Sequence, residues 1–439
     1  MGRPQTTTFP LTGKKFFGIN ILEGLGAWDF WNLYGVTFVV GILIIIPAII
    51  QPAFLQEVIG IPRNLSGSIN SGLQNMSQIA TLLFIGYMGT LSDKYGRVIL
   101  AYIGFFLTGF SYLIFAYAKP IADGMGMNPI AFTYICRFMV AFGFVMTWPM
   151  FSTLAADYTI YPDRGKAMAY NGLMMGAGGI VVFSFLSKLP KHYGIMILFY
   201  ICIALCIIGA LWLKLTLRDR MPEVKATKRS FKVIYQIVAK SPALQVSYMG
   251  VLIARADQMI LGTLIMVWAV TSARAYGYTH LQATGIGGTA LGIQMIVSVI
   301  LTPLFGYLID RIGRLPIIVF SFFLGAAGFF ILGYVGNPFS KWVWLGVSMA
   351  GFAQGVINMT SNALAANVAP KPLLGSIMGG KNSMAPIGSL IFLQLGGLFF
   401  DKYGPASAFY MKGVVNFITV LWILAVSKKV VEEEIPYKP

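Results

Sequence analysis

Long apolar runs dominate the chain, and short polar segments separate them. Twelve of these runs have about 20 residues, the length that a helix needs to cross the hydrocarbon layer of a membrane. The expected spans are 33–54, 65–90, 96–117, 130–155, 166–187, 195–216, 245–270, 281–307, 315–336, 342–366, 375–398 and 406–427. The pattern therefore predicts an all-α membrane protein with twelve transmembrane helices.

The spans fall into two groups of six. We expect an N-terminal tail over 1–32, an N-terminal six-helix half over 33–216, a cytoplasmic linker over 217–244, a C-terminal six-helix half over 245–427 and a cytoplasmic tail over 428–439. Residues 14–28 mix basic and bulky apolar side chains, which favours a short helix lying in the inner membrane interface. A disordered tail leading into the first span is the alternative.

Composition supports a membrane protein. Hydrophobic residues make up 57% of the chain, charged residues only 11%, and the mean hydropathy is +0.75, whereas soluble proteins carry about 25% charged residues. The net charge of +17 could suggest nucleic acid. However, the basic residues gather in loops on one side, above all between Lys214 and Lys240, which is typical of cytoplasmic loops. The charge therefore predicts cytoplasmic termini and no nucleic-acid partner.

Cysteine and histidine add no further chemistry. Cys136, Cys202 and Cys206 all lie in apolar spans, so a disulfide framework is not expected. His192 and His280 fall in separate outer loops and form no cluster of metal ligands. We expect no metal or cofactor and no enzymatic activity. The lipid bilayer is an expected partner, for a monomer in the plasma membrane, or in the inner membrane of a bacterium.

One charged turn occurs twice. GTLSDKYGR runs from Gly89 to Arg97, and GYLIDRIGR runs from Gly306 to Arg314, so that the two aspartates are 217 residues apart. Glycine permits a tight turn, and an aspartate before a helix is favoured by the helix dipole. The residues singled out are Gly89, Asp93, Lys94, Gly96 and Arg97 in the first copy and Gly306, Asp310, Arg311, Gly313 and Arg314 in the second.

This turn resembles the loop motif of the major facilitator superfamily of transporters, and the second copy departs from it only at Ile309. A second repeat agrees with the duplication. LAADYTIYPDRGKAM from Leu154 matches LAANVAPKPLLGSIM from Leu364 at an offset of 210. The resemblance implies two six-helix halves related by pseudo-symmetry, with the substrate near the midplane. It also places the two turns, together with Asp157 and Arg164, at an inner gate.

Four ionisable residues within the spans are candidate site residues, because charge inside a membrane is costly. Arg137 lies in the fourth span, and Arg255 and Asp257 lie in the seventh. Two residues apart on a helix means about 200° of rotation, so Arg255 and Asp257 cannot pair with each other. We expect both to bind substrate, Arg255 as an anion ligand; ion pairs to other helices are the alternative. Lys381 in the eleventh span could instead extend its stem to the inner interface.

Asp29 and Arg137 resemble the acid and arginine of proton-coupled sugar and metabolite symporters of the superfamily. The resemblance implies that Asp29 carries the coupling proton and that Arg137 is its partner. An arginine in a low-dielectric setting keeps a nearby carboxylate ionised, so protonation would change local packing. A solvated acid at the start of the first helix is the other interpretation of Asp29.

Three functions are compatible with these features. The first is a secondary transporter that moves a small organic, anionic metabolite by alternating access and is coupled to protons. The second is an exporter of amphipathic compounds or lipids, for which the 22 Met and 33 Phe residues argue. The third is a membrane receptor that binds without transporting.

Overall fold

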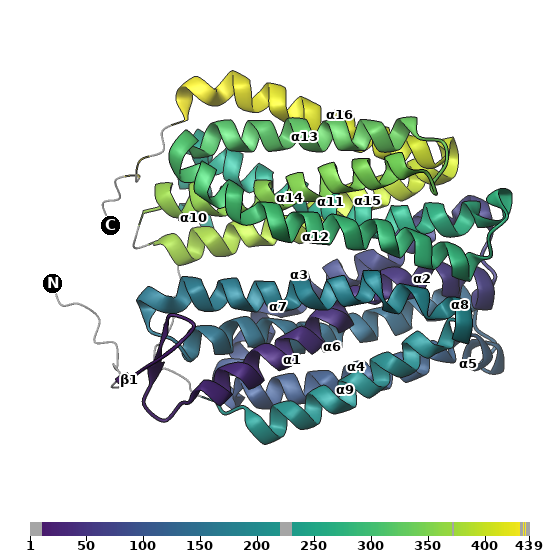
Figure 1. Cartoon of the computed structure of the whole chain (residues 1–439), viewed down its shortest axis with the longest axis horizontal. Coiled ribbons are helices and arrows are strands. Elements are labelled where there is room, and N and C mark those ends of the chain that lie inside the picture. Colours follow the sequence, from purple (N-terminus) through teal and green to yellow (C-terminus); the bar gives the residue numbers. More distant parts are fainter. Residues whose placement is uncertain (1–10, 220–230, 371–372, 431–432, 434, 436–439) are drawn as a thin grey trace. The chain divides into compact units, whose positions relative to one another are not determined.

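The computed structural model describes residues 11–219, 231–370, 373–430, 433 and 435, and it is almost entirely helical (Figure 1). Helices of 19 residues or more number twelve in the described part, as the apolar pattern predicts. They are α1 (Ala27–Ile45), α3 (Ser66–Tyr95), α4 (Arg97–Ala116), α6 (Pro129–Asp157), α7 (Arg164–Ser184), α9 (Met196–Thr216), α11 (Pro242–Ser272), α12 (His280–Ile312), α13 (Arg314–Tyr334), α14 (Lys341–Val368), α15 (Leu374–Tyr403) and α16 (Pro405–Val426).

Ten helical segments of the described chain are long and apolar enough to cross a membrane. Helices α3 and α14 are also long, but they contain several Ser, Asn and Gln residues and fall outside this set. Proline at the first helical position begins α6, α11 and α16, where its missing N–H costs nothing. Helix starts and apolar length thus explain the main elements.

Short elements connect these helices. They are α2 (Pro47–Phe54), a π-helical turn at Leu55–Ile59, α5 (Ala118–Gly124), α8 (Pro190–Tyr193), α10 (Phe231–Lys240) and short 3₁₀ turns. Pro47 ends α1 by removing a backbone donor, and the chain continues as α2. Helix α10 lies within the expected linker.

A β-hairpin stands where we expected an interfacial helix. Strand β1 (Leu11–Phe16) pairs antiparallel with β2 (Ile19–Leu22). Both turn residues, Phe17 and Gly18, have positive φ angles of 43° and 81°, as in the tight turns that join hairpin strands. The prediction of a helix over 14–28 was wrong, because this turn lets the basic and aromatic residues alternate across two strands.

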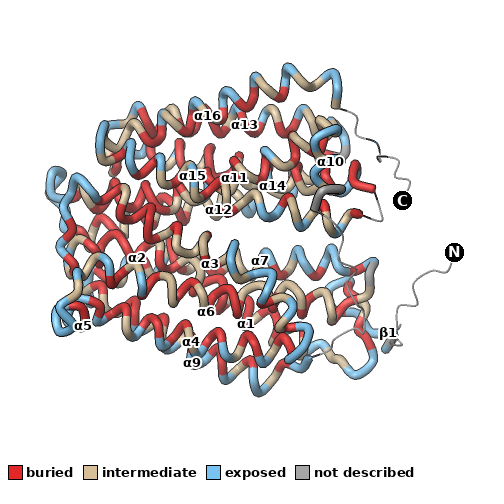
Figure 2. The backbone as a smooth tube through the Cα atoms, turned by 180° about the vertical axis from the view of Figure 1, so that it is seen from behind, coloured by how far each residue is buried: buried red, intermediate tan, exposed pale blue. Residues whose placement is uncertain are grey.

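The chain forms two compact units. The first contains residues 1–50, 80–189 and 193–226, and the second contains residues 51–79, 190–192 and 227–439. The boundary therefore differs from the expected halves, since α2 and the first half of α3 group with the second unit. Buried residues follow the inner faces of the helices in each unit (Figure 2).

Helices approach one another closely at glycines in both units. In the first unit, a Cβ on Gly104 of α4 would lie 2.9 Å from the carbonyl oxygen of Gly143 in α6. In the second unit, a Cβ on Gly328 of α13 would lie 2.8 Å from the carbonyl oxygen of Gly346 in α14. Only glycine permits such close contact between membrane helices. The two units thus use the same packing device.

Candidate functional site: charged residues of a membrane bundle

The first glycine–aspartate turn forms an ion-pair network at the end of the first unit. Gly96, with φ of 103°, separates α3 from α4 and lets Arg97 begin the new helix. The Arg97 guanidinium lies 2.8 Å from the Asp157 carboxylate at the end of α6, and both side chains are almost fully buried. Arg97 also lies 3.2 Å from Asp93, which is 66% exposed. The turn therefore joins α3 and α4 to α6.

Asp219 completes this network and was not predicted from the sequence. Its carboxylate accepts hydrogen bonds from the backbone N–H groups of Arg97, at 2.6 Å, and Val98, at 3.0 Å. The acid thus caps α4, where the helix dipole favours a negative charge. Tyr158 donates a hydrogen bond of 2.8 Å to the carbonyl oxygen of Arg218, which holds this segment in place. The sequence signal was a single acid shortly after the sixth span.

The remaining predicted gate residues of the first unit lie at the same end. Arg164 begins α7, and its charge acts on Asp157. Lys94 lies over the ring of Tyr95, with 4.9 Å from Nζ to the ring centroid. A side chain at Gly89 would meet nothing within 4 Å, so this glycine is not required by contacts within the structure.

The hairpin is fastened to the same end. The Asn20 backbone N–H and side-chain amide donate to Asp163, at 2.9 and 2.7 Å, and Lys166 donates to the carbonyl oxygen of Gly18 at 2.8 Å. The hydrogen bond from the Asn20 backbone, followed by those from its side chain and from Lys166, lowers the pKa of the Asp163 carboxyl below its ordinary value. Phe16 is buried and stacks on Phe30.

The second copy of the turn lacks a matching acid on its neighbour. Gly313 again has a left-handed φ, 99°, and separates α12 from α13. Arg311 lies over the Tyr307 ring at 4.6 Å, and Arg314 begins α13. At the repeat offset of 210, the position of Asp157 is taken by Asn367. The side chain of Asp310 lies outside the described part of the structure. A Cβ added to Gly306 would lie 4.0 Å from the sulfur of Met359, which is ordinary van der Waals contact.

Asp29 and Arg137 lie at different depths of the first unit. Asp29 accepts a hydrogen bond of 2.7 Å from the Gly26 N–H at the start of α1, the helix-start role that the sequence left open. Its neighbour Phe30 packs on Tyr158, 6.1 Å between ring centroids. Arg137 is 2% exposed and precedes Tyr158 by 21 residues, about 30 Å along a helix. The structure therefore does not bring the predicted pair together.

Arg137 instead lies inside the bundle formed by α4, α6 and α9. Its charge acts on Tyr112, which is 1% exposed and also interacts with Cys202 and Cys206. The three cysteines are free thiols, as expected.

Asp257 is paired with a lysine that was not predicted from the sequence. Lys412 in α16 lies 2.8 Å from the Asp257 carboxylate, with side chains 0% and 1% exposed. Asn416 donates a second hydrogen bond to Asp257 at 3.1 Å, and the Lys412 ammonium lies 4.9 Å from the centroid of the Phe392 ring. This is the ion pair to another helix that was the alternative for Asp257. The signal for Lys412 was a lysine inside the expected span 406–427.

Arg255 and Lys381 have amide partners. Arg255 is half-buried and donates to the Gln258 side chain at 2.7 Å. Lys381 is 0% exposed, and its ammonium donates to the side-chain oxygen Oδ1 of Asn362 in α14. No carboxylate pairs with either cation within the described residues. The second unit therefore holds positive charge that the described protein groups do not neutralise.

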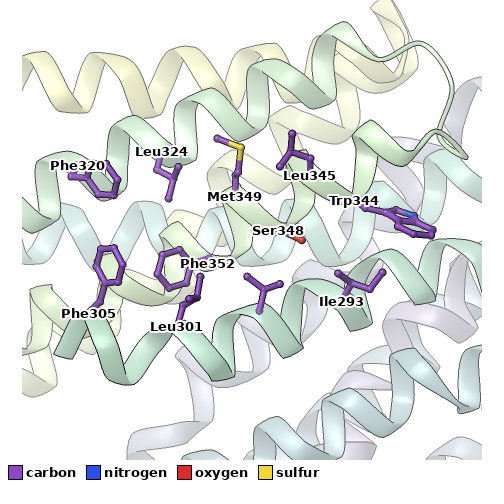
Figure 3. A pocket seen from close by; sticks show the side chains of 11 residues that line it. Ile293, Leu301, Phe305, Phe320, Leu324, Trp344, Leu345, Ser348, Met349 and Phe352 are labelled. Carbon is purple, nitrogen blue, oxygen red and sulfur yellow. The ribbon is translucent and has the colours of Figure 1, made fainter. Parts of the chain in front are cut away.

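An apolar groove opens between α12, α13 and α14 (Figure 3). Its volume is about 560 Å³, and Ser348 is the one hydroxyl among its lining residues. Phe305 of α12 and Phe320 of α13 face each other at one end, and Trp344 of α14 lies at the other (Figure 3). Such a groove suits a hydrocarbon chain or another apolar group.

The family model described as Major Facilitator Superfamily matches residues 33–288 and 251–439. The chain therefore belongs to the major facilitator superfamily. It is a multi-pass integral membrane transporter rather than an enzyme. The expected all-α membrane fold in two six-helix halves is confirmed, with twelve long helices in the described part, of which ten belong to segments long and apolar enough to cross a membrane.

Curated relatives agree with this class. Magnetosome protein MamH of Paramagnetospirillum magneticum is 28% identical over 380 residues, covering 87% of this chain and 88% of the relative. Magnetosome protein MamZ of Magnetospirillum gryphiswaldense is 26% identical over 403 residues, or 90% of this chain, which spans only 62% of that longer protein. Multidrug resistance protein 2 of Bacillus subtilis is 24% identical, covering 82% of this chain and 85% of the relative.

Solved structures share the fold. A mutant of the nucleoside transporter NupG has a TM-score of 0.74 at 13% identity, covering 90% of this chain and 99% of that chain. A D-xylose-proton symporter has a TM-score of 0.72 at 13% identity, covering 92% and 98%. At this identity the likeness concerns the fold alone.

Proposed function

We propose that this transporter moves a small organic anion across its membrane by alternating access, driven by the energy of a proton gradient. The observation that supports an anionic substrate is Arg255, a cation on a membrane helix that donates a hydrogen bond to the side-chain oxygen of Gln258. A guanidinium offers paired N–H donors that match a carboxylate. A carboxylate substrate would supply the negative charge that the described protein groups do not.

Proton coupling in this proposal rests on a buried carboxylate joined to a buried cation. The sequence assigned this role to Asp29 and Arg137, but their separation along the first unit argues against it in this conformation. Asp257 and Lys412 have the required arrangement, at 2.8 Å and without exposure to solvent. Protonation of Asp257 would remove the attraction between α11 and α16, giving a two-state element that one proton can bias.

Uptake into proteoliposomes tests both parts. Purified protein should accumulate radiolabelled lactate, succinate or citrate when the outside is made acidic, and a protonophore should abolish accumulation. Arg255→Ala should lower transport of the accepted anion about tenfold or more, because it removes a charge-assisted contact. Lys341→Ala, at an exposed helix start, is the matched control.

Asp257→Asn separates coupling from binding. We expect it to keep counterflow exchange of the anion but to lose accumulation driven by the pH gradient. If the rate and extent of anion uptake by the wild-type protein did not depend on the pH gradient, proton coupling would be refuted. Full activity in Arg255→Ala would refute the anion assignment.

A second function is favoured by one observation, the apolar groove between α12, α13 and α14. An exporter of amphipathic compounds could admit its substrate there from the bilayer, and a relative carries the name multidrug resistance protein. Ser348→Trp would fill the groove between those helices. It should impair efflux of a lipophilic cationic dye from cells if export is the function, and leave anion uptake unchanged if it is not.

A further inference from the structure

Lys381 carries a charge buried inside the second unit. Its side chain is 0% exposed, and its ammonium donates to the side-chain oxygen Oδ1 of Asn362. Burying an ammonium in a low-dielectric setting is strongly unfavourable unless an opposite charge lies nearby. Within the described residues no carboxylate pairs with it. A charge held at such a cost in a membrane helix indicates a functional role.

The hydrogen bonds continue from Lys381 toward the exposed surface of the unit. The Asn362 side-chain nitrogen donates to the Asn358 side-chain oxygen at 3.4 Å, one turn away on α14. Asn358 itself is exposed, whereas Lys381 is not. We name Lys381, Asn362 and Asn358 the amide relay.

The direction of the amide relay is fixed by the lysine. An ammonium has only donors, so it takes the oxygen of Asn362 and leaves the nitrogen of that amide to donate onward. Asn358 accepts this hydrogen bond with its side-chain oxygen. Its side-chain nitrogen is therefore the donor at the exposed end of the relay. Aligned hydrogen bonds polarise one another in a low-dielectric setting. The relay therefore presents an N–H donor, strengthened by a buried cation, which suits an anionic oxygen.

The other half of the chain shows that packing does not require this charge. At the repeat offset of 210, Lys381 corresponds to Asn171 of α7, and Asn362 corresponds to Ser152 of α6. These two residues make the same contact between the equivalent helices, with the Asn171 amide nitrogen 3.2 Å from the Ser152 hydroxyl. Thr37 donates to Asn171 at 3.0 Å. A neutral amide is thus sufficient to join the helices.

We propose that the amide relay is an oxyanion-binding site of the second unit, which accepts a carboxylate or phosphate oxygen at Asn358. This inference rests on the proposed transport of an anion and assigns a second point of contact to it, besides Arg255. Both sources of the ligand, a carboxylate substrate and free phosphate, share the acceptor oxygen that the relay requires.

Thermal unfolding of the full chain in lipid nanodiscs tests the relay. Succinate and inorganic phosphate are each titrated against chloride at equal ionic strength, and the rise in the unfolding temperature gives the apparent Kd. We expect Lys381→Met and Lys381→Gln to abolish the rise, Lys381→Arg to keep part of it, and Asn358→Ala to weaken binding by about tenfold.

Asn171→Met is the matched control, since it alters the equivalent contact in the first unit and should keep the anion-dependent rise. An unchanged rise in both Lys381→Met and Lys381→Gln would overturn the relay. If the rise then depended on Arg255, the proposed anion transport would stand without it. No rise with any anion in the wild-type protein would overturn the relay and the anion assignment together.

Discussion

The two units bury positive charge in different ways. In the first, the Arg137 guanidinium in α6 lies beside Tyr112 of α4. In the second, the Lys412 ammonium in α16 lies 2.8 Å from the carboxylate of Asp257 in α11. The buried cation of the second unit therefore lies on α16, the last long helix of the bundle, and its partner is the carboxylate of Asp257.

The repeat offset of 210 makes this difference explicit. Lys412 corresponds to Cys202, and Asn416 corresponds to Cys206. Both cysteines are buried in α9, at the same places in the helix as the lysine and asparagine in α16. The corresponding long helices are present in both units, whereas the polar groups inside the two bundles have diverged. The two halves of this transporter therefore contain corresponding helices but bury different polar side chains.

The turn ends of the units differ in the same manner. Arg97 in the first unit is held by Asp157, whereas the equivalent of Asp157 in the second unit is the neutral Asn367. The acid that pairs with Arg97 in the first unit therefore has a neutral residue at its equivalent position in the second. Substitutions at matched positions of the two units test whether these differences contribute to the free energy of unfolding.

The largest effect is expected for Lys412→Met. It leaves Asp257 charged and buried without its cation, which should cost about 3–5 kcal/mol of unfolding free energy. Cys202→Ala, at the equivalent position, should cost about 1 kcal/mol for the lost packing. Equilibrium unfolding in detergent gives both values. If Lys412→Met were no less stable than Cys202→Ala, the two units would not differ in the way described. Adding Asp257→Leu to Lys412→Met should restore most of the lost unfolding free energy, because it removes the unpaired buried charge.

An intermediate effect is expected for Gly96→Ala compared with Gly313→Ala. Both glycines have left-handed φ angles, 103° and 99°, so each alanine should cost about 1–3 kcal/mol through backbone strain. At Gly96 a Cβ would also collide with the Asp219 carboxylate, whereas at Gly313 the nearest atom, on Pro316, is 3.7 Å away. Thermal unfolding should therefore rank Gly96→Ala as the more damaging. Equal losses would mean that Asp219 moves aside without cost.

The smallest effect concerns Asp163, whose repeat equivalent is Leu373. Because hydrogen bonds lower its pKa in the folded protein, the carboxylate contributes stability above its unfolded pKa of about 3.9. That contribution is lost as the pH falls through the lower, folded pKa. Asp163→Asn should lower the unfolding temperature at pH 7 by an amount equivalent to about 1 kcal/mol. The difference from wild type should shrink toward pH 3, and a constant difference would contradict it.

The apolar pattern was sufficient to predict the membrane helices, because each membrane-spanning helix must be long and apolar on its own. The repeated turns were sufficient to predict the family. Contacts between distant segments could not be read in this way. Asp219 caps α4 from 122 residues away, and Lys412 meets Asp257 across two helices, so neither is marked by a local pattern.

Two predictions relied on local sequence alone: the interfacial helix, which was wrong, and the proton site at Asp29, which stays a prediction. The aromatic and basic residues around Phe17 suit an interfacial helix as well as a hairpin, and the docking on Asp163 decides between them. Asp29 fits a proton site by its place in the sequence, but depth along the helix depends on where α1 begins, and it begins at Ala27. Spacing alone did not fix either structure.

The docked hairpin imposes an order on synthesis. Asn20 and its partner Asp163 are 143 residues apart, which corresponds to roughly 7–30 s of translation at ordinary elongation rates. The strands therefore emerge from the ribosome well before α6 and the start of α7 exist to receive them. During that interval the hairpin has no docking site on the chain. Docking therefore cannot be completed before α6 and the start of α7 have been synthesised.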